Sequence, residues 1–269
     1  EVAQDGRRGA LMLTISIKHP DAERFIDAKV DTSKVTGANV SVKIDDEFMR
    51  AAIAGKPYHQ QFPIDAEKPM YEQDIDARAL WKKIIHNAWK SAEPGVLFWD
   101  TILRESIPDC YADEGFNTVS TNPCGEIPLC PYDSCRLLAL NLYSYVDKPF
   151  TAEASFDFSK FRDHVGKAMR MMDDIIDLEL EKVEQIIAKI DADPEEADIR
   201  YVESNLWKKV REMALKGRRT GLGITAEGDM IAALGMRYGS DKAVAFAVEV
   251  HKTLALAAYG ASVEMAEER

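Results

Sequence analysis

The densest group of chemically capable side chains in this chain lies in the segment NPCGE, residues 122–126. Asn122, Cys124 and Glu126 alternate along it and offer an amide, a sulfur and a carboxylate. In extended backbone, residues two apart point to the same side, so we expect the three side chains to project together. A sulfur beside a hydrogen-bonding amide and a potential base is typical of a reaction centre. Proline and glycine in this segment suit a loop that holds Cys124 out from the backbone. The alternative is a surface turn with a buried cysteine.

Cysteine usage gives a second indication about the chemistry. The chain has four cysteines, which are too few in 269 residues for a disulfide scaffold and indicate a reduced, cytoplasmic setting. Cys130 and Cys135 have the spacing of half a structural zinc site, but no second pair or histidine partner is near them. We therefore predict no metal site, and we assign ordinary packing to Cys110 and Cys130.

The region that must position this loop, residues 1–150, is predicted to be α/β. Residues 10–17 are typical of a buried strand, and residues 39–44 alternate between apolar and polar side chains as a strand does. Helices are predicted at residues 21–30 and 74–91. Strands and helices that alternate in this way favour an α/β over an all-β architecture.

The second region, residues 151–269, is predicted to be mainly helical. Apolar residues recur at helical spacing over residues 158–189, and a further helix is predicted at residues 195–216. The glycine-rich segment 217–223 interrupts the pattern before a final helix that begins near Ser240.

Composition limits the classes of function. Acidic residues exceed basic ones by 46 to 34, a formal charge of −12, which argues against a whole-surface nucleic-acid binder. The sequence has no apolar run long enough for a transmembrane helix and no secretory signal, so we expect no membrane partner. It begins without methionine and stops inside a helical pattern, and both ends therefore look like cuts through a longer protein.

Residues 122–129 (NPCGEIPL), named here the finger loop, resemble the active-site finger loop of ribonucleotide reductases. The Pro-Cys-Gly form resembles the adenosylcobalamin-dependent class, class II. Other stretches resemble the family in the same order along nearly the whole chain: RRGALM at 7–12, HPD at 19–21, GANVSV at 37–42, EPGVLF at 93–98, LNL at 140–142 and RRTGLGI at 218–224.

The resemblance implies a fold. In that family the catalytic domain is a ten-stranded α/β barrel with the finger loop inside. Residues 1–150 would form part of this barrel, and residues 151–269 would be a helical region of the same catalytic domain.

The resemblance also implies an activity, which is the reduction of ribonucleotides to 2′-deoxyribonucleotides for DNA synthesis by an oxidoreductase. Cys124 would become a thiyl radical, generated with adenosylcobalamin, and would abstract the 3′ hydrogen of the ribose. Glu126 would be the base at the 3′ hydroxyl, and Asn122 would hydrogen-bond the substrate. Cys135 would be one of two cysteines that supply electrons and form a disulfide.

The family further implies partners and regulation. Arg7, Arg8, Gly9 and Ala10 resemble the end of the loop that relays the identity of a deoxynucleotide or ATP effector to the substrate site. The substrate would be a ribonucleoside diphosphate, the reductant an external dithiol protein similar to thioredoxin, and the full-length enzyme a homodimer. The second redox cysteine would lie upstream of this sequence, so we expect the 269 residues alone to be inactive.

Two alternatives stay open at this point. The chain could belong to another branch of the same radical superfamily, either the di-iron-dependent class I or a glycyl-radical relative. It could also be a non-catalytic helical interaction module in which the cysteines are merely structural. In the second case Cys124 would have no chemical role.

Overall fold

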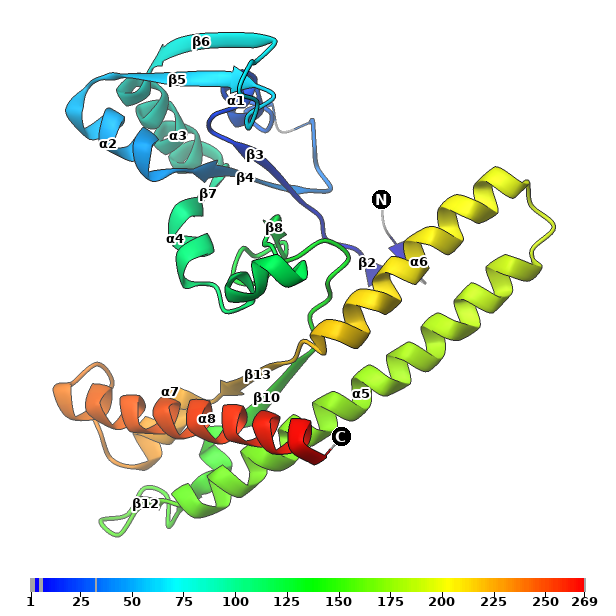
Figure 1. The fold of residues 1–269 in the computed structure, drawn as a ribbon. Coiled ribbons are helices and arrows are strands. Elements are labelled where there is room, and N and C mark those ends of the chain that lie inside the picture. Colours follow the sequence, from blue (N-terminus) through cyan, green and yellow to red (C-terminus); the bar gives the residue numbers. More distant parts are fainter. Residues whose placement is uncertain (1–2, 5–6, 32, 269) are drawn as a thin grey trace. The chain divides into compact units, whose positions relative to one another are not determined.

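The computed structural model describes residues 3–4, 7–31 and 33–268. The contacts within the chain divide it into two compact units, Glu1–Pro131 and Tyr132–Arg269. Both units contain helices and strands (Figure 1), so the predicted α/β class is confirmed.

The first unit is built on a parallel three-stranded sheet. Its strands are β3 (Met12–Ser16), β4 (Asn39–Ile44) and β7 (Gly95–Phe98), and β4 lies in the centre. Both strand pairs are parallel, which requires crossover connections between them. The strands predicted at residues 10–17 and 39–44 are confirmed, the first with slightly shorter bounds.

Three helices pack against this sheet: α1 (Ala22–Ile26), α2 (Asp46–Ala54) and α3 (Ala77–Ser91). The helix predicted at residues 21–30 is therefore shorter than expected. The core between sheet and helices consists of apolar side chains that are almost completely buried, among them Ile17, Ile26, Val42, Ile44, Phe48, Leu80 and Ile84.

A hairpin of β5 (Pro57–Phe62) and β6 (Tyr71–Asp76) precedes α3. The helix predicted at residues 74–91 is thus wrong at its start, because residues 74–76 pair with β5. The helix begins only where the Asp76 side chain accepts a hydrogen bond of 3.0 Å from the backbone N–H of Ala79.

The first unit ends with a segment of short elements that contains the finger loop. It comprises α4 (Trp99–Glu105), the 3₁₀ helix η1 (Pro108–Glu114), and the strands β8 (Ser120–Thr121) and β9 (Pro128–Leu129). The two strands pair antiparallel and close the finger loop at its base.

The second unit combines a short parallel sheet with long helices. β10 (Leu137–Asn141) pairs in parallel with β13 (Gly221–Thr225), and the connection between them contains α5 (Phe158–Ala192) and α6 (Ala197–Gly217). The helices α5 and α6 run side by side as a hairpin, and the last helix, α8 (Asp241–Glu268), also packs on α5 (Figure 1). The predicted helical character of this region is confirmed.

Four short elements complete this unit: η2 (Leu142–Tyr145), β11 (Val146–Asp147), β12 (Ser155–Phe156) and α7 (Glu227–Ala233). With α5 and α8 they enclose a core whose buried members include Leu142, Tyr145, Phe156, Phe161, Val165, Met230 and Val250. The described strands form separate small sheets and no closed barrel. No helix within the described residues is both long enough and apolar enough to cross a membrane.

Candidate active site

The part of the finger loop that lies between β8 and β9 is a compact turn. The backbone N–H of Asn122 donates to the carbonyl of Ile127 at 3.1 Å, and the N–H of Gly125 donates to the carbonyl of Asn122 at 3.0 Å. Gly125 has a φ of +84°, a region that side-chain-bearing residues avoid. A Cβ there would meet Leu97 at 3.6 Å, an ordinary contact. The backbone conformation, rather than lack of space, therefore requires glycine at this position.

Asn122 and Glu126 come together across this turn. The Asn122 side-chain amide donates to Glu126 Oε1 at 2.7 Å, while its Oδ1 accepts from the backbone N–H of Ile127 at 2.9 Å. Asn122 thus uses both ends of its amide, one to hold the loop and one to hold the carboxylate. Cys124 lies between them at the turn, with an exposed side chain.

The predicted extended backbone is wrong, although Asn122 and Glu126 do lie together. The loop is not extended, because the hydrogen bond from Gly125 to Asn122 closes a turn. A turn brings residues at its two ends together, so Asn122 and Glu126 meet by chain reversal rather than by alternation along a strand.

Cys135 lies in the second unit, immediately before β10. It is half-buried, and a Cβ added to Gly221 of β13 would lie 3.7 Å from its sulfur. The same Cβ would lie 3.0 Å from the carbonyl oxygen of Arg136 and 2.8 Å from Leu137 Cδ2, so close strand approach requires glycine at position 221. The N–H of Gly221 donates to that Arg136 carbonyl at 2.7 Å.

Residues that form ion pairs flank Cys135 in the sequence. Asp133, with only 6% of its side chain exposed, pairs with Arg219 at 2.7 Å. Arg136, with 8% exposed, pairs with Glu179 at 2.6 Å and donates to the carbonyl of Arg219 at 3.1 Å. Sequence reasoning missed Asp133, Arg136 and Glu179. Asp133 and Arg136, which are opposite charges within two residues of the candidate Cys135, could have been noticed, but Glu179 is distant in the sequence.

The predicted effector-loop residues are only partly described. Arg7 and Arg8 form the short strand β2, which pairs antiparallel with β1 (Ala3–Gln4), but their side chains lie outside the described part. Gly9 and Ala10 follow and are exposed. The prediction that an arginine here contacts substrate or relays an effector stays a prediction.

The family model described as "Ribonucleotide reductase, barrel domain" matches residues 2–269. The chain belongs to this ribonucleotide reductase family. The match includes both compact units and therefore both candidate cysteines, Cys124 and Cys135.

Curated relatives of this reductase domain carry similar names. A vitamin B12-dependent ribonucleoside-diphosphate reductase of Thermoplasma acidophilum is 34% identical over 98% of the chain, which covers 30% of that protein. One from Mycobacterium tuberculosis strain CDC 1551 / Oshkosh is 31% identical over 98% of the chain and 33% of that protein. A vitamin B12-dependent ribonucleotide reductase of Streptomyces clavuligerus is 28% identical over 97% and 26%. The chain thus spans about a third or less of the length of these relatives.

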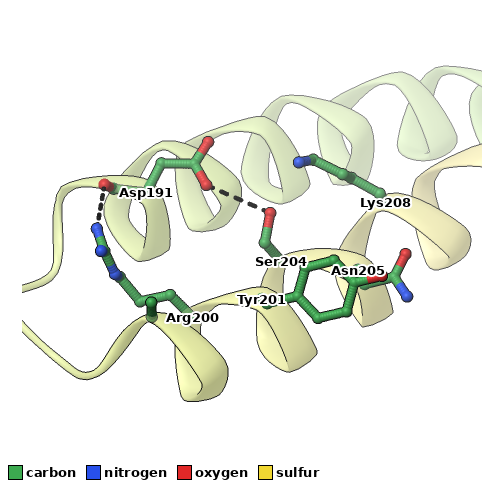
Figure 2. Close-up of a pocket in the computed structure, with 7 residues that line it drawn as sticks. Asp191, Arg200, Tyr201, Ser204, Asn205 and Lys208 are labelled. Atoms are coloured by element: carbon green, nitrogen blue, oxygen red, sulfur yellow. Dashed lines mark hydrogen bonds between the residues drawn. The ribbon is translucent and has the colours of Figure 1, made fainter.

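The reductase domain also has a polar pocket of about 260 Å³ between the end of α5 and the start of α6 (Figure 2). Its lining includes Arg200, Tyr201 and Lys208, and the Asp191 carboxylate accepts a hydrogen bond of 3.3 Å from Ser204. It contains none of the residues predicted to carry chemistry. In the part of the chain that the structure describes, no group of three His, Cys, Asp or Glu side chains is placed to bind a metal ion.

Proposed function

We propose that this chain is the central catalytic portion of a B12-dependent ribonucleotide reductase that converts ribonucleoside diphosphates to 2′-deoxyribonucleoside diphosphates. The observation that carries the proposal is the match of residues 2–269 to the reductase barrel domain. The Asn122–Glu126 contact of 2.7 Å around an exposed Cys124 supports it, because an amide, a base and a thiol then share one small loop. The names of the relatives favour B12 dependence over the di-iron and glycyl-radical alternatives.

The proposed chemistry begins at the ribose C3′. The Cys124 thiyl radical removes the 3′ hydrogen atom, which restores the thiol and leaves a carbon radical at C3′. Glu126 accepts the proton of the 3′ hydroxyl, and this assists loss of the 2′ hydroxyl as water. Asn122 holds Glu126 in place with one N–H of its amide, and its second N–H hydrogen-bonds the substrate. A radical is required because the 3′ hydrogen is not acidic enough for a base to remove.

Cys135 and a second thiol outside this chain close the cycle. Together they supply two electrons and two hydrogens, and their sulfurs become a disulfide. Cys124 returns its hydrogen atom to C3′ and is again a thiyl radical, and Glu126 returns its proton to the 3′ oxygen. The net change is ribonucleotide plus dithiol to deoxyribonucleotide, disulfide and water. An external dithiol protein similar to thioredoxin then reduces the disulfide. This requirement for a reducing partner supports a cytoplasmic location.

The cofactor that fits this scheme is adenosylcobalamin. When bound, it supplies the radical that oxidises a thiol, chemistry that amino-acid side chains do not provide. The radical that the cofactor supplies would have to reach Cys124. The Cys124 side chain is exposed on a turn and meets that requirement. Cobalamin carries its cobalt within its own ring, so the fit requires no cluster of metal-binding side chains from this chain. We assign no residue of the chain to the holding of the ring.

The proposal extends to architecture and assembly. We infer that the parallel strands β3, β4, β7, β10 and β13 belong to a ten-stranded barrel that encloses the finger loop. Residues 1–150 would contribute part of the barrel and residues 151–269 the helical region of the same domain. Arg7, Arg8, Gly9 and Ala10 would end the loop that relays the bound deoxynucleotide or ATP effector, in a homodimeric enzyme.

Cofactor dependence of the full-length reductase tests the function. We expect it to form deoxyribonucleoside diphosphates only when adenosylcobalamin and a dithiol are both present. The isolated 269-residue chain, assayed beside it, is expected to form none, because the second redox cysteine lies elsewhere. Undiminished turnover of the full-length protein without cobalamin would show that it belongs to another class of reductase.

A further inference from the structure

Lys43 occupies an unusual position for a lysine. It lies on the central strand β4, and its side chain points to the opposite face from those of Val42 and Ile44, which are 0% and 1% exposed. Its own side chain is half-buried, and this burial lowers the pKa of its ammonium group. Among the residues that the structure describes, no carboxylate pairs with it at 4.0 Å or less. A charge placed here without an acidic partner needs another explanation.

The contacts of Lys43 supply that explanation. Its ammonium lies 4.0 Å from the centre of the Trp99 ring, a cation–π distance. It also donates a hydrogen bond to the backbone carbonyl of Val119. Val119 directly precedes β8, and its N–H donates to the carbonyl of Leu129 at 2.9 Å. Lys43 therefore holds the base of the hairpin that presents the finger loop.

A second side chain of β4 holds the hairpin near its tip. Asn39 donates from its amide to the carbonyl of Pro123 at 2.7 Å, one residue before Cys124. Asn39 and Lys43 point to the same face of β4 because side chains alternate along a strand. Residue 39 contacts residue 123 and residue 43 contacts residue 119, so this stretch of the hairpin runs antiparallel to β4 across its face.

The two other strands of the sheet touch the same segment. The hydroxyls of Thr14 on β3 and Ser120 lie 3.3 Å apart. Leu97 on β7 lies under Gly125, close enough to contact an added Cβ at 3.6 Å. All three strands therefore contact the hairpin, but Lys43 is the only charged anchor among these contacts. Charge-assisted hydrogen bonds are stronger than neutral ones.

We propose that Lys43 is a positioning residue for Cys124, because its ammonium fixes the base of the finger-loop hairpin on β4 while Asn39 fixes the tip. This inference rests on the proposed function for its catalytic consequence, since a thiyl radical must meet the 3′ hydrogen at close range. Loss of the anchor would leave the sheet intact and let the loop move, and small misplacements of reacting groups slow turnover strongly.

The test uses the full-length reductase with Lys43→Met, Lys43→Arg and the control Lys56→Met, an exposed lysine of the same unit. We expect Lys43→Met to lower kcat by about 10- to 100-fold. Lys43→Arg should recover most of the turnover, because it keeps a charged donor and the cation–π contact. Lys56→Met should behave as wild type.

A second readout separates positioning from general stability. The rate of alkylation of Cys124 by iodoacetamide in the cofactor-free protein, relative to exposed Cys110, should change several-fold in Lys43→Met and stay constant in Lys56→Met. Asn39→Ala should also change the ratio of the two alkylation rates. If Lys43→Met does not fold, the Asn39→Ala variant tests the anchoring of the hairpin on β4 in its place. An unchanged ratio in the folded variants would overturn the inference. Alkylation needs neither cofactor nor turnover, so this result is independent of whether the proposed function holds.

Discussion

Asn122 shows how one neutral side chain can organise a reactive loop. Its amide binds the backbone of Ile127 on one side and the Glu126 carboxylate on the other, at 2.9 and 2.7 Å. Glu126 is therefore held in one orientation by Asn122, and its proposed role as a base requires such preorganisation. Cys124 has no such restraint in the described loop beyond the turn itself, so the positions of its neighbours determine where its sulfur lies.

Substitution of Glu126 by glutamine tests the assigned base. Glutamine keeps an oxygen that can accept from Asn122, so the loop should keep its shape, but it cannot take the 3′ hydroxyl proton. We expect the kcat of the full-length enzyme to fall by about 10²- to 10⁴-fold. Glu114→Gln, a change at an exposed glutamate of the same unit, provides the control. A Glu126→Gln enzyme with kcat within about twofold of the control would remove Glu126 from the mechanism.

At the scale of elements, the sequence predicts best the strands and helices in which apolar residues recur at the spacing of one buried face. The apolar run at residues 10–17 and the alternating pattern at residues 39–44 are strands in the structure, and the helical pattern at residues 158–189 lies within α5. The hairpin β5–β6 was missed because YEQDID is polar and lacks a strong local strand signal. Its structure comes from pairing with residues 57–62, and pairing partners are not encoded locally.

The candidate site was predictable only in part. The motif identified Asn122, Cys124 and Glu126, and the structure brings the first and last together. Lys43 and Arg136 were missed because their partners are a backbone carbonyl and residues more than 40 positions away. The lysine in the alternating segment NVSVKI was the available signal, since a charged side chain on a predicted sheet strand needs a reason.

Gly221 is the element-scale position most sensitive to change. A methyl group there would lie 2.8 Å from Leu137 Cδ2 and 3.0 Å from the Arg136 carbonyl oxygen. Gly221→Ala should therefore push β13 from β10 and destabilise the second unit by about 1–3 kcal/mol. Gly228→Ala, in α7 with nothing within 4 Å of its added Cβ, should be neutral or stabilise by up to about 1 kcal/mol. Thermal unfolding of the two variants measures the difference, and equal midpoints would contradict the strand contact.

Because Lys43 is half-buried, we expect the free energy of unfolding of the first unit to vary with pH in the alkaline range. Burial lowers its pKa in the folded state below the ordinary value of 10.5, so between the two values the unfolded chain binds more protons. The free energy of unfolding therefore rises as pH increases from the lowered pKa to the ordinary one. This gain in stability is lost again when pH falls back through the lowered pKa. We expect wild type to gain stability relative to Lys43→Met as pH approaches 10.5. A difference in melting temperature between the two proteins that does not change with pH would show that burial does not lower the pKa of the Lys43 ammonium.

At the scale of the whole molecule, the proposed chemistry requires both compact units. Cys124 belongs to the first unit and Cys135 to the second, so neither unit alone contains both the proposed radical thiol and the proposed redox thiol. The chain spans 30% of its Thermoplasma acidophilum relative, and the second redox thiol is expected outside it. A net charge of −12 agrees with small nucleotides rather than nucleic acid as the ligand, because phosphate recognition then requires only a local positive site.

The most direct test of the central claim is turnover of the full-length enzyme with Cys124→Ala. The change removes one exposed sulfur, so the fold should be retained, as circular dichroism and thermal unfolding would show. Cys110→Ala, at another exposed cysteine, is the matched control. We predict that Cys124→Ala abolishes deoxyribonucleotide formation while Cys110→Ala leaves it at the wild-type rate. A folded Cys124→Ala enzyme that still reduces ribonucleotides at a rate near that of the control would contradict the account.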